Sequence, residues 1–256
     1  MNLTINKTIL LVEDDPMLSF IHSNSLKKYG YKIIIASSGE EAIETLKGSQ
    51  IIDLILMDID LGEDSMDGTM AAQTILANYD IPIVFLSSHT EPEIVEKTEK
   101  ITSYGYVVKS SHITVLDASI KMAFKLFDAH QKLSESEEKF KQVYDNTLDN
   151  IFILEITEEK RYKLIDINYE EETLVGKLET IQNKLLEDFL PTDLFTKVKS
   201  NYDRCLKEGK AISYQESVYG QDFYTQLIPV KNKKGDIYRI IGIARNISEL
   251  SKVTKN

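Results

Sequence analysis

The chain has 256 residues, 42% of them hydrophobic and 28% charged, a composition typical of a globular protein long enough for two cores. No apolar run reaches the roughly 18 to 20 residues that span a bilayer, and no secretion signal is present, so we expect a cytoplasmic protein. The net charge of -11 lies mostly in residues 1–128, and such a surface disfavours direct nucleic-acid binding.

In the first half, short apolar runs alternate with amphipathic stretches. The apolar runs predict buried strands at 7–12, 32–36, 53–57, 83–86 and 105–108. Helical spacing of apolar residues predicts helices at 16–29, 40–47, 67–78, 91–101 and 112–128. This alternation predicts an α/β fold with a parallel sheet covered on both faces, in which ligands bind at the carboxyl ends of the strands.

Residues 112–146 contain no Pro or Gly and are rich in helix formers. Two interpretations fit. The last helix of the first domain could be followed by a solvated linker at 129–146, or one continuous signalling helix could pair with its copy in a homodimer.

The second half has a different order of elements. Strands are expected at 151–156 and 162–167, mostly helical structure at 169–207, and further strands at 211–218, 223–230 and 237–247, with a turn at 232–235. This order predicts an α+β domain with an antiparallel sheet and helices on one side.

Acidic and polar residues follow the predicted parallel strands. Glu13, Asp14 and Asp15 follow the first strand, Asp58 ends the third, Ser87 ends the fourth, and Lys109 ends the fifth. Carboxylates gathered at one sheet edge repel one another unless a cation lies among them, and oxygen ligands suit Mg²⁺ or Mn²⁺. An aspartate beside such an ion can attack an activated phosphoryl group, while Lys109 and the Ser87 hydroxyl neutralise phosphoryl oxygens.

Four segments resemble the motifs of the response-regulator receiver family: residues 11–16, 56–61, 85–88 and 104–109. The resemblance covers about residues 5–128. It implies a flavodoxin-like, doubly wound sheet of five strands in the order 2-1-3-4-5. It also implies that a histidine kinase is the phosphodonor.

The same resemblance assigns roles to individual residues. Asp58 would be the phosphoacceptor, Asp14 a direct Mg²⁺ ligand and Glu13 a ligand through water, with the backbone carbonyl of Asp60 completing the set and Asp15 an accessory acid. Tyr106 matches the switch aromatic of the family. Ser110 stands where the family usually has Pro, often after a cis bond, so we expect the loop after Lys109 to differ.

Residues 137–250 resemble a PAS domain, a small sensor fold that binds small ligands or dimerises. The resemblance is carried by residues 136–140, Asn168, 229–230 and 235–247. The predicted organisation is a receiver domain at 5–128, a helical linker at 129–146 and a PAS domain at 147–250.

The composition of the second half argues against two common cofactors, and the PAS ligand stays unknown. His22, His89, His112 and His130 all precede the domain, so a histidine-ligated haem has no axial ligand. Cys205, the one cysteine, lacks the motif of cysteinyl-flavin photosensors and is expected to be a buried thiol. A lone cysteine also excludes an internal disulfide or a multi-cysteine metal site.

The leading hypothesis is a two-component response regulator that accepts phosphate without being an enzyme in its own right. One alternative is the front part of a hybrid histidine kinase, although no Gly-rich nucleotide-binding segment occurs here. Another is a phosphohydrolase, because Asp58 and Asp60 have Asp-x-Asp spacing.

Overall fold

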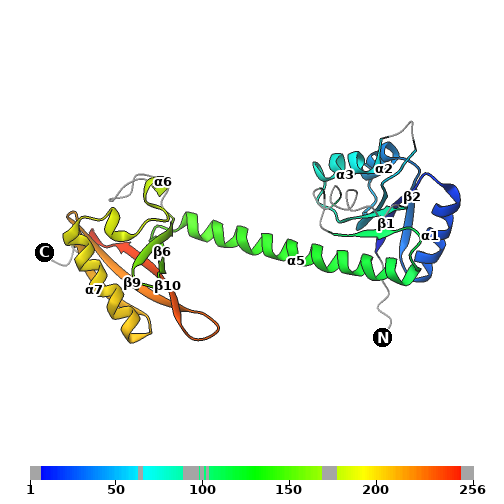
Figure 1. Ribbon diagram of the computed structural model, residues 1–256. Helices are drawn as coiled ribbons and strands as arrows, with labels where there is room; N and C mark the ends of the chain where they lie inside the picture. Colours follow the sequence, from blue (N-terminus) through cyan, green and yellow to red (C-terminus); the bar gives the residue numbers. More distant parts are fainter. Residues whose placement is uncertain are drawn as a thin grey trace. The chain divides into compact units, whose positions relative to one another are not determined.

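The computed structural model describes residues 7–62, 66–88, 98, 101, 104–168 and 178–248. The chain divides into two compact units, Met1–Glu135 and Ser136–Asn256 (Figure 1).

The first unit contains a five-stranded parallel sheet in the order β2-β1-β3-β4-β5. Its strands are β1 (Thr8–Val12), β2 (Lys32–Ala36), β3 (Leu54–Asp58), β4 (Ile83–Ser87) and β5 (Tyr106–Val108). Every residue of β1, β3 and β4 is buried, as a sheet covered on both faces requires. The predicted α/β class, strand order and flavodoxin-like architecture are confirmed.

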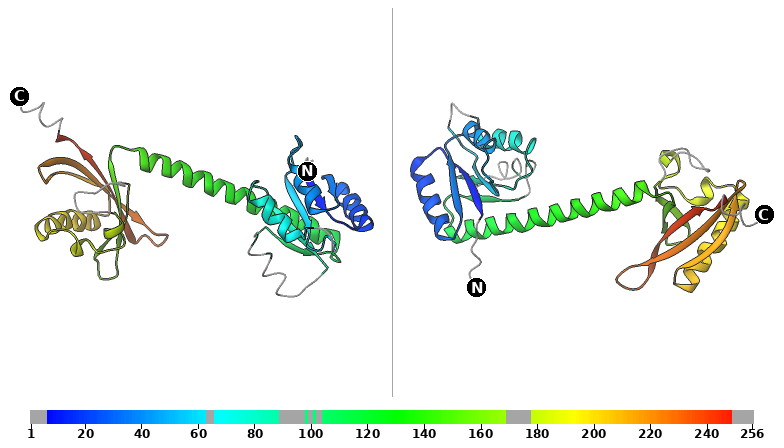
Figure 2. Two further views of the ribbon diagram at one scale, coloured as in Figure 1. Left: turned by 90° about the horizontal axis from the view of Figure 1, so that it is seen from above. Right: turned by 180° about the vertical axis from the view of Figure 1, so that it is seen from behind.

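Four described helices cover the two faces of this sheet: α1 (Pro16–Lys28), α2 (Gly39–Leu46), α3 (Gly68–Leu76) and α5 (Ile113–Asn146). Leu10 and Val12 of β1 pack in one core cluster with alanines of α2 and α3. Ile9 and Leu11 alternate to the other face and pack with residues of α1 and α5. Figure 2 shows these helices from two further sides.

The helix α5 begins in the first unit and runs without interruption for 34 residues into the second. Ile113–Asn146 is thus one continuous helix, as the second interpretation of this segment expected, and its pairing with a copy stays a prediction. The helix predicted at 91–101 lies outside the described residues, apart from Thr98 and Ile101.

The second unit contains a five-stranded antiparallel sheet in the order β7-β6-β10-β9-β8. Its strands are β6 (Asn150–Ile156), β7 (Tyr162–Ile167), β8 (Ile212–Val218), β9 (Gln221–Lys231) and β10 (Ile237–Asn246). One face packs on α7 (Thr192–Glu208), whose Val198, Tyr202 and Cys205 share a core with the sheet. A turn joins β9 to β10, closed by the Gly235 N–H donating to the Asn232 carbonyl at 3.0 Å.

The prediction of mostly helical structure at 169–207 is confirmed over its described residues, although one connection there is not helical. Residues 169–177 lie outside the described residues, and α6 (Leu178–Ile181), the 3-10 helix η1 (Leu186–Asp188) and α7 are helical. The backbone around η1 instead pairs with the edge of β7. The Leu164 N–H donates to the Lys184 carbonyl at 2.9 Å, and the Asn183 N–H to the Leu164 carbonyl at 2.7 Å.

Candidate functional site

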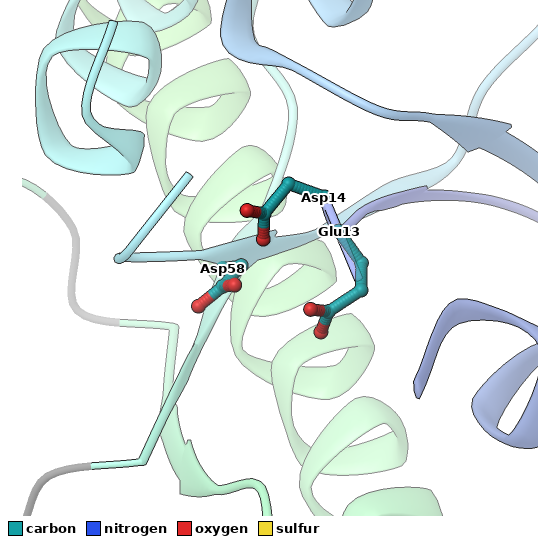
Figure 3. A group of neighbouring side chains, drawn as sticks. All are labelled: Glu13, Asp14 and Asp58. Atoms are coloured by element: carbon teal, nitrogen blue, oxygen red, sulfur yellow. The ribbon is translucent and has the colours of Figure 1, made fainter. Parts of the chain in front are cut away.

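Three carboxylates converge at the carboxyl ends of β1 and β3. Glu13 and Asp14 follow β1, Asp58 ends β3, and each offers an oxygen that lies within 4.8 Å of the other two. Figure 3 shows these side chains grouped at the sheet edge. Glu13 and Asp58 are 1% and 0% exposed, whereas Asp14 is exposed, so the group opens to solvent on the Asp14 side.

Lys109 connects the two buried carboxylates. Its ammonium donates to Asp58 Oδ2 at 2.5 Å and to Glu13 Oε1 at 3.0 Å. The lysine is held by its own backbone, because the Lys109 N–H donates to the Ser87 carbonyl at 2.8 Å. Lys109, the residue after β5, therefore places a positive charge at Asp58, the predicted phosphoacceptor.

Burial and charge act in opposite directions on Asp58. Burial raises the pKa of the Asp58 carboxyl to about 7; the hydrogen bond from Lys109 opposes that rise, and the negative charge of Glu13 adds to it. Burial lowers the pKa of Lys109, but hydrogen bonds to Asp58 and Glu13 outweigh it and raise the pKa above its ordinary value. The ammonium is therefore charged at neutral pH.

The donor set fits a hard divalent cation. All three side chains offer carboxylate oxygens, the ligand type that Mg²⁺ prefers. Glu13 Oε2 is buried and has no hydrogen-bond partner within the described part of the chain. A buried carboxylate oxygen left unsatisfied costs free energy, which a cation or its bound water would recover.

The backbone around Asp58 is closely packed, and sequence reasoning missed one residue responsible. The Asp60 N–H donates to Asp58 Oδ1 at 3.2 Å. A Cβ added at Gly68 would lie 1.8 Å from the Asp58 carbonyl oxygen, so only glycine lets α3 begin there. The available signal was the Asp67-Gly68 pair, because Asp67 caps α3 and glycine follows the cap directly.

The remaining predicted residues occupy several environments. Ser87 is buried at the end of β4, and Tyr106 is half-buried on β5 and packs against the core cluster shared with α2 and α3. Asp15 caps α1, because its Oδ1 accepts from the N–H groups of Met17 and Leu18, and its role as an accessory acid stays a prediction.

The loop after Lys109 begins with a tight turn. The Ser111 N–H donates to the Val108 carbonyl at 2.9 Å, and no peptide bond among the described residues is cis. Ser110 therefore follows Lys109 through a trans bond.

His22 of α1 is a second residue near this site that sequence reasoning did not identify. Burial lowers the pKa of its imidazole, and the positive charge of Lys109 lowers it further. The imidazole is therefore neutral at pH 7. Its three-residue spacing from the buried Ser19 was the available signal.

Comparison with known proteins identifies the family to which the first unit is similar. The sequence profile of the response regulator receiver domain matches residues 9–121. "Uncharacterized transcriptional regulatory protein YrkP" of Bacillus subtilis is 28% identical over 163 residues, which cover 63% of this chain and 68% of that protein. "Transcriptional regulatory protein ZraR" of Escherichia coli is 30% identical over 119 residues, which cover 46% of this chain and only 26% of that protein.

A solved structure is similar over the same region. It is the N-terminal domain of a response regulator/sensory box/GGDEF 3-domain protein from Carboxydothermus hydrogenoformans. It is 47% identical, covers 48% of this chain and 98% of that domain, and has a TM-score of 0.45. No described helix is long and apolar enough to cross a membrane. The profile match, the parallel sheet and the acidic group at its carboxyl edge together show that residues 9–121 are a response regulator receiver domain.

Proposed function

We propose that this chain is a two-component response regulator in which Asp58 accepts a phosphoryl group from the phosphohistidine of a histidine kinase. The observation that carries the proposal is the Glu13, Asp14 and Asp58 group with the Lys109 ammonium on Asp58. In this role the chain is a phosphoacceptor and has no kinase activity of its own.

The residues that would hold Mg²⁺, or Mn²⁺, are Asp14 and Asp58 directly, Glu13 through water and the backbone carbonyl of Asp60. When bound, the ion supplies positive charge that offsets the negative phosphoryl oxygens. An ion held there would account for the unsatisfied Glu13 Oε2.

In the proposed reaction a carboxylate oxygen of Asp58 attacks phosphorus while the P–N bond of the donor breaks. The electron pair of that bond leaves with the donor imidazole, and an acyl phosphate forms on Asp58. Lys109 already lies at the carboxylate and pairs with the incoming phosphoryl oxygens. The Ser87 hydroxyl moves onto another oxygen, and Tyr106 follows it inward.

Labelling by acetyl phosphate with Mg²⁺ tests the assignment, with the intact mass as the readout. Asp58→Asn should remove the added phosphoryl mass. Asp60→Asn is the matched control and should keep it, because only the Asp60 backbone is assigned a role. Stoichiometric labelling of Asp58→Asn would refute the phosphoacceptor. Phosphate-ester turnover that Asp60→Asn abolishes would support the Asp-x-Asp hydrolase instead.

We further propose that α5 pairs with its copy in a homodimer. Three apolar residues, Leu126, Leu133 and Phe140, recur at seven-residue intervals and are 45%, 57% and 60% exposed. Met122 and Val143, 56% and 70% exposed, extend this apolar stripe at the spacings of a coiled coil.

The stripe is separate from the face of α5 that packs on the receiver sheet. Leu116, Ile120 and Ala123 are 4%, 0% and 0% exposed and already fill the core. A helix that only completed the receiver would need one apolar face. The second apolar face is exposed and suits contact with α5 of a second copy of the chain.

For the second unit, we propose a PAS domain that receives the signal through α5. Support comes from its five-stranded antiparallel sheet with helices on one face and from the sequence resemblance. Although relatives are named transcriptional regulators, the negative charge of residues 1–128 argues against direct nucleic-acid binding by this part. A band-shift assay with duplex DNA at low salt tests that expectation.

A further inference from the structure

The second unit has a partly open cavity between the helix-covered face of its sheet and α7. Its volume is about 490 Å³, within the range of small-molecule sites. Most of its lining is apolar, with Phe152, Leu164 and Phe223 from the sheet and Leu194 and Val198 from α7. An apolar space of this size can bury the body of a small organic molecule.

A close approach on the sheet helps to keep this space open. Gly242 of β10 lies opposite Phe152 of β6 in the antiparallel register. A Cβ added at Gly242 would lie 1.9 Å from the Phe152 ring. The ring therefore lies against the bare backbone of β10 instead of projecting further into the cavity.

One carboxylate faces this apolar space. Glu216 of β8 lines the cavity, and its Oε1 accepts a hydrogen bond at 3.1 Å from the hydroxyl of Thr225, which is 1% exposed. The other oxygen, Oε2, is buried beneath the cavity surface. Burial raises the pKa of Tyr214, and so does the nearby Glu216 carboxylate, with which the tyrosine shares a hydrogen bond. Thr225 and Tyr214 thus position the carboxylate at the cavity wall.

The surroundings of Glu216 favour a positively charged ligand over a negatively charged one. The described lining includes no lysine, arginine or histidine. The nearby Tyr202 has a pKa raised by burial and then by the negative charge of Glu216. An anionic ligand would meet this charge with no counter-cation from the described lining, whereas an ammonium group would be attracted to it. Asn150, Gln221 and Asn246 add neutral polar groups to the lining.

We propose that the cavity binds a small organic cation with an apolar body, whose amine or amidine group pairs with the Glu216 carboxylate at the cavity wall. The apolar walls take the body of the ligand, and the carboxylate held by Thr225 takes its charged end.

Three probes of matched size test the charge preference on the full-length chain by isothermal titration calorimetry. They are 4-phenylbutylamine, 4-phenylbutanol and 4-phenylbutyrate. The amine should bind about tenfold or more tightly than the alcohol, and the carboxylate should bind weakest, because only the amine forms a charge-assisted hydrogen bond. Equal affinities, or no amine binding up to about 1 mM, would overturn the proposal.

Variants then locate the site. Glu216→Gln should weaken amine binding by about tenfold or more and leave the alcohol nearly unchanged, because an amide keeps the shape of the side chain but not its charge. Glu158→Gln removes the same charge from an exposed turn and should leave all affinities unchanged. Ala244→Phe adds a ring to the cavity lining and should reduce amine and alcohol binding together.

The probe series on the unmodified chain decides the charge preference even if Glu216→Gln fails to fold. Circular dichroism establishes whether each variant is folded. If a folded Glu216→Gln chain binds the amine with unchanged affinity, the amine does not bind at Glu216 and the proposed site is wrong.

Discussion

Lys109 forms ion pairs with two carboxylates that are both shielded from solvent. Glu13 and Asp58 have fully buried side chains, and the lysine side chain is 10% exposed. Removing one partner from such a group leaves uncompensated buried charge. A divalent cation would neutralise the same negative charge, so the lysine and a bound metal would act on one pair of carboxylates.

Lys109→Met should destabilise the receiver domain by about 3–5 kcal/mol without Mg²⁺. Saturating Mg²⁺ should restore more stability to the variant than to the unmodified chain, because it neutralises carboxylates that have lost their ammonium. Urea unfolding with and without Mg²⁺ measures both effects. The control is Lys47→Met, which breaks a 2.7 Å pair with Glu44 in which the two side chains are 59% and 74% exposed. It should cost at most about 1 kcal/mol, independently of Mg²⁺; an equal gain from Mg²⁺ in both variants would contradict this account.

Gly68 controls the position of Asp58 through a contact that involves no side chain. Gly68→Ala should shift the start of α3 or the end of β3, because the new Cβ cannot remain 1.8 Å from the Asp58 carbonyl oxygen. We expect a loss of about 1–3 kcal/mol in the free energy of unfolding and slower labelling of Asp58 by acetyl phosphate.

The control is Gly39→Ala, whose new Cβ would lie 2.8 Å from Ala71 Cβ, away from Asp58. It should also lower stability while leaving the labelling rate of the folded protein unchanged. If both glycine variants slow labelling equally, the effect is general destabilisation and not the position of Asp58.

At the scale of elements, α5 has one buried and one exposed apolar face. Leu133→Glu places a charge on the exposed apolar stripe, where it should disfavour helix pairing and shift the chain from dimer to monomer. Ser134→Glu introduces the same residue at a neighbouring exposed position off the stripe and should leave the assembly unchanged. Light scattering after size-exclusion chromatography measures the mass of both. A wild-type chain that is already monomeric would remove the basis for pairing.

The strands of the receiver domain were predictable because their signal is local. Each is a short apolar run, and residues such as Asp58 and Ser87 mark strand ends where polar groups converge. The backbone around η1 was not predictable in this way, since it pairs with β7, about 20 residues earlier. Gly68 depends likewise on a contact with another element.

Glu216 is a case in which a sequence signal existed but was not used. Ile212, Tyr214 and Val218 alternate on one face of β8, and Glu216 falls on that same face. Alternation alone shows that a carboxylate lies on the apolar side. The cavity in front of it depends on how β8, β10 and α7 pack, which no local pattern contains.

At the scale of the whole molecule, the proposed phosphoacceptor Asp58 and the cavity lie in different units, and the chain connects those units through α5. An uninterrupted helix can transmit a change in rotation or register, because its hydrogen-bonded backbone keeps the phase between its ends. The proposed signal therefore depends on helical phase and not only on a covalent connection. This dependence distinguishes transmission through α5 from independent action of two tethered domains.

Insertions after Ser134 test helical phase directly. Two added alanines rotate one end of α5 by about 200° relative to the other, whereas a duplicated segment 128–134 of seven residues nearly restores the phase. With acetyl phosphate and Mg²⁺, amide hydrogen exchange in β6 and β10 should change in the unmodified chain and in the seven-residue insertion, but not in the two-residue insertion. Intact mass must show that Asp58 is labelled in all three chains. An exchange response that survives the two-residue insertion would mean that the second unit senses phosphorylation by a route other than the phase of α5.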